Sequence, residues 1–437
     1  MTNENKPRCL VLGLDGLPFS LARELCREGK LPNLANLALA EQAKAINAEL
    51  PELSPVNWTS FFTASGPEIH GIFGFTALNP KDYTLHCADF TWVQTPTIFD
   101  RLGEKGLISK IVNLPNTYPA RPLKGMLISG FVAPDLKNAV YPPFLLGPLQ
   151  GAGYILEADT HRGAQDWEFL LQELRTTLAS RRKALDLFWP DLAWDLFVFV
   201  LTETDRLGHF LFPALQNPGH AMHTACLDFL QEWDQLIGEV LERYEALPEP
   251  KRLLVLADHG FTSLKTEVDL NAWLRQMGFL QIQGEAENEW ASQIISPSSR
   301  AFALDPGRIY IHDQQRFARG QVGANQVNSI GQEIKSELLK INYQGHPVIN
   351  RVWTREELYP GTYHPMAPDL ICEPYPGFDL KGKFDRKEIF GFYGRQGCHT
   401  STDAFFYDSL GKDPLTVRGV GQEVLDFFAE SKIILSA

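Results

Sequence analysis

The chain has 437 residues, of which 44% are hydrophobic and 21% charged, and its formal net charge is −13. This composition is typical of a globular protein and excludes disordered, collagen-like and coiled-coil chains. The acidic balance disfavours binding to nucleic acid polymers and anionic lipid surfaces, although a local positive charge can still bind a phosphate group. No apolar run approaches the roughly 18 residues of a membrane-spanning helix, so we expect no membrane span.

The N-terminal segment and the cysteines indicate a compartment. Residues 1–8 are polar and lack the charged-then-apolar pattern of a secretion signal. Six cysteines are scattered along the chain without any C-x-x-C pair. In a chain of this length, such a distribution is typical of reduced thiols rather than of a disulfide framework. The sequence therefore predicts a cytoplasmic protein.

Short apolar runs that end in polar or turn-forming residues recur along the chain. They are Cys9–Leu14, Ser109–Leu114, Leu196–Leu201 and Leu253–Ala257. Continuous runs of this kind are typical of strands buried on both faces of a parallel sheet. Helical patterns lie between them, at 19–28, 96–106 and 221–244. The alternation predicts an α/β fold with a largely parallel central sheet and helices on both faces.

The pattern changes in the second half of the chain. A polar stretch at 281–299 is followed by a strand-like run at 307–311 and a helical pattern at 326–340. We therefore expect three parts: a first part of the core at 1–275, with Pro- and Gly-rich loops at 135–165; an inserted cap or lid at 276–356; and a completion of the core at 357–437. The oligomeric state is not predicted.

Ser54 and Pro55 form a helix start, with Ser54 as the expected N-cap and Pro55 as the first helical residue. Such a pair is usually only structural, and Thr95-Pro96 is expected to open another helix with no chemistry nearby. A helix N-terminus nevertheless favours an anion. A hydroxyl at that place becomes a nucleophile if a metal ion also binds it. The amide of Asn57, one turn on, is able to donate to a phosphoryl oxygen.

Carboxylates and imidazoles follow several of the expected strands. Asp205 and His209 are four residues apart, which on a helix places both on one face, where they can hold one metal ion. The remaining candidates stand at strand ends or in glycine-rich turns; they are Asp15, Asp258, His259 and His399. This mixed oxygen and nitrogen set suits zinc, with manganese or iron as alternatives. Two divalent ions would balance three carboxylates and one serine alkoxide, so the site can accept an anion.

The ordered set of these motifs resembles the alkaline phosphatase superfamily and, within it, the type I phosphodiesterase/nucleotide pyrophosphatase family. The resemblance extends from Leu10 to about Phe406. Besides the residues above, the motifs that carry it are His70-Gly71-Ile72, the segment 112–119 and the segment 367–370. It implies an alkaline-phosphatase-like core. Because the order and spacing of all the motifs agree, the match is stronger than any single motif.

The resemblance also implies a role for each residue. Asp15, Asp258, His259 and the Ser54 hydroxyl would hold one metal ion, whereas Asp205, His209 and His399 would hold the second. Ser54 would be the nucleophile, in a position where many relatives have threonine. Asn57 would contact a nonbridging phosphoryl oxygen, and this residue type favours phosphodiester or pyrophosphate substrates. The related sulfatases require C/S-x-P-x-R, which this chain lacks at Ser54, so a formylglycine nucleophile is excluded.

The sequence therefore predicts a two-metal hydrolase, with zinc as the expected metal, that cleaves phosphodiester or pyrophosphate bonds through a phospho-serine intermediate. Its expected partner is a small phosphate ester. One alternative is a phosphomonoesterase or phosphonate hydrolase on the same site. Another, from a different class, is a protein that binds a phosphate ligand without turning it over. A complete set of candidate ligands argues against this last alternative.

Overall fold

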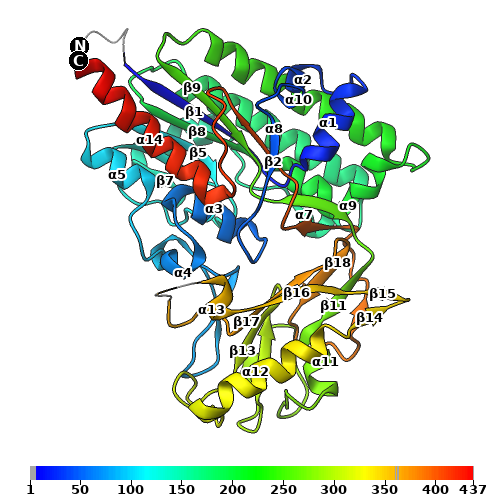
Figure 1. Ribbon diagram of the computed structural model, residues 1–437. Helices are drawn as coiled ribbons and strands as arrows, with labels where there is room; N and C mark the ends of the chain where they lie inside the picture. The colour runs from blue at the N-terminus through cyan, green and yellow to red at the C-terminus, as the bar shows by residue number, and fades with distance from the viewer. Residues whose placement is uncertain (1–5, 360, 362–363, 437) are drawn as a thin grey trace.

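The computed structural model describes residues 6–359, 361 and 364–436. The chain forms two units, and the larger one contains an eight-stranded sheet (Figure 1) with the order β2-β21-β9-β1-β8-β5-β6-β7. In chain order, its strands are β1 (Arg8–Leu14), β2 (Lys44–Ile46), β5 (Ser109–Leu114), β6 (Gly125–Ser129), β7 (Val140–Tyr141), β8 (Leu196–Leu201), β9 (Lys251–Leu256) and β21 (Ala404–Asp408).

The centre of this sheet is parallel. Strands β9, β1, β8, β5 and β6 pair in parallel with their neighbours, whereas β7 and β21 pair antiparallel at the two sides. Every residue of β1, β5 and β8 is buried, as expected for strands covered on both faces. The expected α/β core with a largely parallel central sheet is confirmed.

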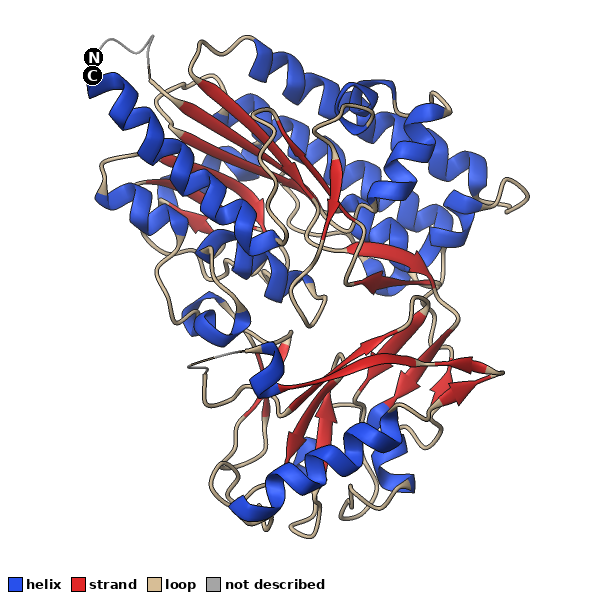
Figure 2. Ribbon diagram, viewed as in Figure 1, coloured by secondary structure: helices blue, strands red, loops and turns tan. Residues whose placement is uncertain are grey.

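Helices cover the sheet in two groups, and Figure 2 shows the strands between them. In one group, three helices pack against one another: α3 (Ser54–Thr63), α5 (Ile98–Glu104) and α14 (Val417–Ser436). The other consists of α1 (Phe19–Arg27), α2 (Pro32–Ala38), α8 (Trp167–Phe188), α9 (Glu203–Gln216) and α10 (His223–Glu245). Among the described residues, no helix is long and apolar enough to cross a membrane.

Two local expectations for the larger unit are wrong. Helix α5 does not open at Thr95-Pro96 but at Ile98, because Thr97 caps it in a reciprocal pair of hydrogen bonds with Asp100. The Pro- and Gly-rich segment 135–165 also contains regular structure, namely β7, α6 (Leu146–Gly151) and α7 (Thr160–Gly163). The side chain of Asp159 caps α7. Local capping thus overrides what the proline and glycine content alone suggests.

The smaller unit, called here the second unit, comprises the elements from β11 to β19 (Figure 1). It contains three sheets, with the orders β12-β13-β17-β16, β18-β11-β19 and β14-β15. Its strands are β11 (Thr266–Asp269), β12 (Ala301–Leu304), β13 (Arg308–Ile311), β14 (Asn342–Tyr343), β15 (His346–Pro347), β16 (Ile349–Thr354), β17 (Leu370–Pro374), β18 (Phe378–Lys381) and β19 (Phe390–Gly391). Its helices are α11 (Leu270–Gln276), α12 (Ala324–Leu338) and α13 (Arg355–Leu358).

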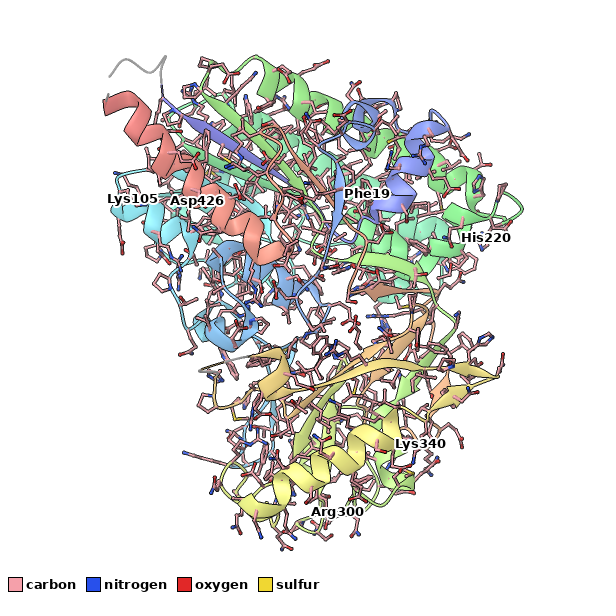
Figure 3. All side chains as sticks on the ribbon, in the orientation of Figure 1. Phe19, Lys105, His220, Arg300, Lys340 and Asp426 are labelled. Carbon is pink, nitrogen blue, oxygen red and sulfur yellow. The ribbon has the colours of Figure 1, made fainter. Side chains whose placement is uncertain are left out.

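The second unit has its own hydrophobic core. This core runs from Val268 to Phe384 and also takes in Leu78 and Tyr83, so it extends beyond the segment 276–356 on both sides. Leu78 and Tyr83 come from the region of a small hairpin formed by β3 (Thr76–Leu78) and β4 (Leu85–Cys87). Figure 3 shows Arg300 and Lys340 on this unit, and Phe19, His220 and Asp426 on the larger one.

Candidate metal centre and active site

Three aspartates meet at one edge of the central sheet. Asp15 follows β1, Asp205 lies in the first turn of α9 after β8, and Asp258 follows β9. Because β8, β1 and β9 are adjacent and parallel, their carboxyl ends lie together, which is where ligands bind in sheets of this type. All three side chains are buried.

The last histidine reaches this edge through a small antiparallel sheet. It consists of β10 (Gly260–Ser263) and β20 (Gly397–Thr400), and it pairs Phe261 with His399. The pairing stacks the rings of His259 and His399, whose centroids are 3.6 Å apart. Nδ1 of His399 lies 2.8 Å from the backbone oxygen of Glu52, which leaves Nε2 facing the carboxylates.

Asp205, His209 and His399 form one compact group of potential metal ligands. Nε2 of His399 lies 3.2 Å from Oδ1 of Asp205 and 3.1 Å from Nε2 of His209. Nε2 of His209 lies 3.4 Å from the same aspartate oxygen. Tetrahedral zinc ligands at about 2.0–2.1 Å from the ion are roughly 3.3 Å from one another. The spacing of these three atoms therefore fits a zinc ion.

Asp15, Asp258 and His259 form a second group, whose ligand atoms lie within 4.8 Å of one another. Nε2 of His259 is 3.8 Å from Oδ1 of Asp15 and 3.4 Å from Oδ2 of Asp258. These two carboxylate oxygens are buried and accept no hydrogen bond from any residue that the structure describes. Buried charged oxygens without a partner are costly, so a cation is the ligand that suits them.

The electrostatics of the site also fit cations. Burial first, and then repulsion from Asp258 and Asp205, raises the pKa of Asp15 well above its ordinary value. Burial and the charge of Asp205 raise the pKa of Asp258 to about 6. Burial also acts to raise the pKa of Asp205, but His209, Arg206 and His399 hold it well below its ordinary value. Divalent ions would remove the repulsion among these carboxylates.

Ser54 lies beside the second group. Its Oγ is 3.3 Å from Nε2 of His259, and its side chain is buried. The expectation that Ser54 is the N-cap is wrong by one position: Leu53 is the N-cap, with an extended backbone, and Ser54 is the first residue of α3. The difference does not move Ser54 away from the helix N-terminus, where free N–H groups favour an anion.

Asn57 does not face this site. Its Oδ1 accepts a hydrogen bond of 2.6 Å from the backbone N–H of Glu49, and its Nδ2 donates to the backbone oxygens of Glu49 and Leu53. The side chain is fully buried, and these bonds use both of its N–H donors. In this structure, Asn57 fixes the segment that leads into α3, and it has no donor left for a phosphoryl oxygen.

Two side chains that the sequence reading missed hold the ligands in place. Nε1 of Trp58 donates a hydrogen bond of 3.0 Å to Oδ2 of Asp15. Arg206 is paired with Oδ2 of Asp205 and with Glu157, and its guanidinium lies over the ring of Phe131. Trp58 is four residues after Ser54, and residues at this spacing share one face of a helix. This spacing was the only feature of the sequence that could have predicted its position near the site.

A cavity of about 660 Å³ opens beside the metal centre. His209 and His399 line it together with residues of the second unit, so it lies between the two units. Aromatic, basic and acidic side chains all contribute to its lining. The aromatic ones are Phe75, Trp290, Phe378 and Tyr393, the basic ones Lys381, Lys383, Arg386, Lys387 and Arg395, and the acidic ones Glu52, Glu267, Glu289, Asp305, Asp379, Asp385 and Glu388. Its volume is in the range of small-molecule binding sites.

Solved structures share this fold. Phosphonoacetate hydrolase from Sinorhizobium meliloti, in complex with phosphonoacetate, has a TM-score of 0.64 at 14% identity, over 98% of this chain and 96% of that chain. Murine ectonucleotide pyrophosphatase/phosphodiesterase 5, as an inactive variant in complex with AMP, has a TM-score of 0.55 at 11% identity, over 97% and 95%. The alkaline phosphatase PafA has a TM-score of 0.55 at 13% identity, over 92% and 91%.

These likenesses show an alkaline-phosphatase-like fold. No curated protein matches the sequence. Residues 9–401 match the type I phosphodiesterase / nucleotide pyrophosphatase family, and the chain belongs to this family. Family membership and fold together place the chain among the phosphoryl hydrolases of the superfamily.

Proposed function

We propose that this protein is a two-metal hydrolase that cleaves phosphodiester or pyrophosphate bonds in small molecules through a phospho-serine intermediate. The observation that carries the proposal is the position of Ser54, whose Oγ lies 3.3 Å from Nε2 of His259 at the N-terminus of α3. The family supports the reaction class. The metal ions are most consistent with zinc, because the ligand atoms combine imidazole nitrogens with carboxylate oxygens.

We assign the following roles to the residues of the site. Asp15, Asp258, His259 and Ser54 would hold one ion, and Asp205, His209 and His399 the other. When bound, two divalent ions activate a hydroxyl nucleophile and neutralise charge that develops on phosphorus. The Ser54 oxygen attacks phosphorus in line, a new P–O bond forms, and the bond to the leaving group breaks. Water then hydrolyses the phospho-serine and restores the hydroxyl.

The N-terminus of α3, the burial of the site and the adjacent cavity contribute to this chemistry. The helix presents unpaired N–H groups and a partial positive charge where the phosphoryl group would lie next to Ser54. Burial of the site keeps bulk water away from the reacting atoms, which strengthens each electrostatic interaction. The cavity of about 660 Å³ leaves room for a second ester substituent or a leaving group.

The second candidate is a phosphonate hydrolase on the same residues. It is supported by the phosphonoacetate hydrolase structures, whose TM-scores of 0.63 and 0.64 exceed the 0.55 of the murine phosphodiesterase complex. The position of Asn57 also removes the one side-chain argument in favour of diesters. The family description and the room in the cavity continue to favour a diester or pyrophosphate.

The test is hydrolysis of bis-p-nitrophenyl phosphate and of a p-nitrophenyl nucleotide by the zinc-loaded protein. Ser54→Ala is expected to abolish turnover, because it removes the attacking oxygen. Ser54→Thr is the matched variant that keeps a hydroxyl, and it should retain measurable activity. Trapping labelled phospho-serine at acid pH would support the intermediate. Equal activity of Ser54→Ala and wild type would refute the nucleophile, and no turnover of any phosphate ester would favour a non-catalytic binding protein.

A further inference from the structure

Five basic side chains line the cavity beside the metal centre: Lys381, Lys383, Arg386, Lys387 and Arg395. Seven acidic side chains line the same cavity, so a substrate anion is attracted only by a cation that these carboxylates leave unpaired. Cations already paired with carboxylates have little attraction left for a substrate anion, whereas an unpaired cation retains it.

Three of the five cations are neutralised within the second unit. Nζ of Lys381 is 2.7 Å from Oδ2 of Asp379. Nζ of Lys383 is 2.8 Å from Oδ2 of Asp305. Nη1 of Arg386 is 2.7 Å from Oε2 of Glu267. These pairs form part of the wall. Lys387 is exposed at the rim, where solvent screens its charge.

Arg395 differs from the other four. It is half-buried, and within the part of the chain that the structure describes, its guanidinium has neither a carboxylate within ion-pair distance nor a hydrogen-bond acceptor. Its loop is fixed on the metal centre, because the N–H of the next residue, Gln396, donates a hydrogen bond of 2.8 Å to the backbone oxygen of His209. The charge of Arg395 is close enough to help burial lower the pKa of His209.

Glu52, the acidic residue nearest to Ser54 in the sequence, does not form an ion pair with Arg395. Glu52 is buried and also lines the cavity, but the charged groups that act on it are Glu373, Asp379 and Lys381. A partly desolvated guanidinium therefore faces the cavity on the side of the Asp205–His209–His399 group. Guanidinium groups bind carboxylates and phosphates through two parallel hydrogen bonds.

We propose that Arg395 binds an anionic group on the leaving-group side of the substrate, so that the preferred substrates carry a second negative charge next to the phosphoryl group that is cleaved. This inference rests on the proposed function, in which Asp205, His209 and His399 serve the leaving oxygen. It narrows the substrate class to phosphoryl compounds whose leaving group bears a carboxylate or a further phosphate. Arg395 would be a binding residue that contributes specificity.

The experiment compares two matched phosphodiester substrates, methyl phenyl phosphate and methyl 3-carboxyphenyl phosphate, which differ by one carboxylate. For wild type, we expect kcat/KM to be about 10- to 100-fold higher for the carboxylate, the range of a hydrogen bond to a charged group. Arg395→Ala should remove this preference and leave bound metal unchanged. Arg395→Lys should retain part of it, because it keeps the charge but loses the planar fork. Arg300→Ala, a charge-matched control on the second unit outside the cavity lining, should retain all of it (Figure 3).

A binding measurement separates this inference from the proposed function. Phenylphosphonate and 3-carboxyphenylphosphonate are titrated calorimetrically into the zinc-loaded Ser54→Ala protein, with and without Arg395→Ala. Tighter binding of the carboxylate only when Arg395 is present supports the inference, whether or not the enzyme turns over phosphate esters. Equal binding of both phosphonates, or a preference that survives Arg395→Ala, overturns it. If the wild-type protein shows this binding preference but turns over no phosphate ester, the result would instead count against the proposed function and leave the role of Arg395 intact.

Discussion

The two units of the molecule contribute different parts of the site. The larger unit supplies the aspartates, which stand at the ends of three adjacent parallel strands, together with Ser54, His209 and His259. The second unit supplies most of the cavity wall, through loops and short strands between 267 and 395. From this comparison we expect the parallel sheet to position the reacting groups and the second unit to select the substrate. The predictions below test this division.

The largest effect is expected from the metal ligands of the larger unit. Asp205→Ala should lower turnover on the order of a thousandfold, because the site loses a ligand and with it several kcal/mol of charge stabilisation. Bound metal, measured by inductively coupled plasma mass spectrometry, should fall by one ion per chain. Unchanged metal content would contradict the assignment of Asp205, and a comparable loss from a variant of the cavity wall would break the division between the units.

The next effect concerns stability and pH. The pKa of Asp258 is raised to about 6 in the folded protein, first by burial and then by Asp205. A raised pKa gives stability that is present below the unfolded value near 4 and is lost as the pH rises through about 6. In metal-free protein, Asp258→Asn should therefore increase the free energy of unfolding at pH 7.5 by about 3 kcal/mol, and much less at pH 4.5.

Denaturant unfolding of chelator-treated wild type and variant, at both pH values, checks this expectation. With zinc present, the order should reverse at pH 7.5, because the variant has lost a ligand that stabilises the folded state by binding. A variant that is less stable than wild type at pH 7.5 even without metal would show that the carboxylate is not repelled in the folded protein.

Trp58 tests how α3 holds a ligand. Trp58→Phe removes the indole hydrogen bond to Asp15 but keeps an aromatic ring, and metal affinity is expected to fall about 10- to 100-fold. Trp233→Phe is a matched control, since Trp233 is fully buried and its indole N–H has no hydrogen-bond partner among the described residues. Zinc titration in competition with a chromogenic chelator measures both. Equal losses in the two variants would mean that packing, and not the hydrogen bond, is responsible.

The smallest effect is expected in the cavity wall. Trp290 is 46% exposed and lines the cavity. Nζ of Lys383 lies over its ring, 4.1 Å from the ring centroid. Trp290→Ala should raise KM by about 2- to 10-fold, the range of aromatic and cation–π contacts, with kcat and bound metal unchanged. Phe144→Ala, at an exposed aromatic outside the cavity lining, is the control. A fall in kcat alone would show that the wall acts in the chemical step.

The sequence predicted the parts of the site whose signals are local. Asp258-His259 follows a strand of five apolar residues, and Asp205 and His209 share a helical face, so both pairs stood out. The structure confirmed the parallel sheet that these patterns imply. The residues that hold the ligands had no comparable signal, because the contact of Trp58 with Asp15 depends on how α3 packs against the sheet.

Asn57 shows that helical spacing alone does not predict which side chains contact the substrate. One helical turn separates it from Ser54, but its amide is used by the backbone of Glu49 and Leu53, and the path of that segment is not visible in the sequence. Arg395 illustrates the converse. It is an ordinary arginine in a glycine-rich loop, and only the pairing of the neighbouring cations in the folded second unit distinguishes it. The residues that contact a substrate in the cavity are therefore harder to predict from the sequence than the candidate metal ligands, because their roles depend more on tertiary packing.

The central claim is that seven side chains from distant parts of the chain hold two divalent ions around one serine oxygen. Crystals of the zinc-loaded protein, measured above the zinc absorption edge, test it most directly. We expect two anomalous peaks, one among Asp15, Asp258, His259 and Ser54 Oγ and the other among Asp205, His209 and His399. The account would be contradicted if no anomalous peak lay near these side chains, or if a single peak were shared by both groups.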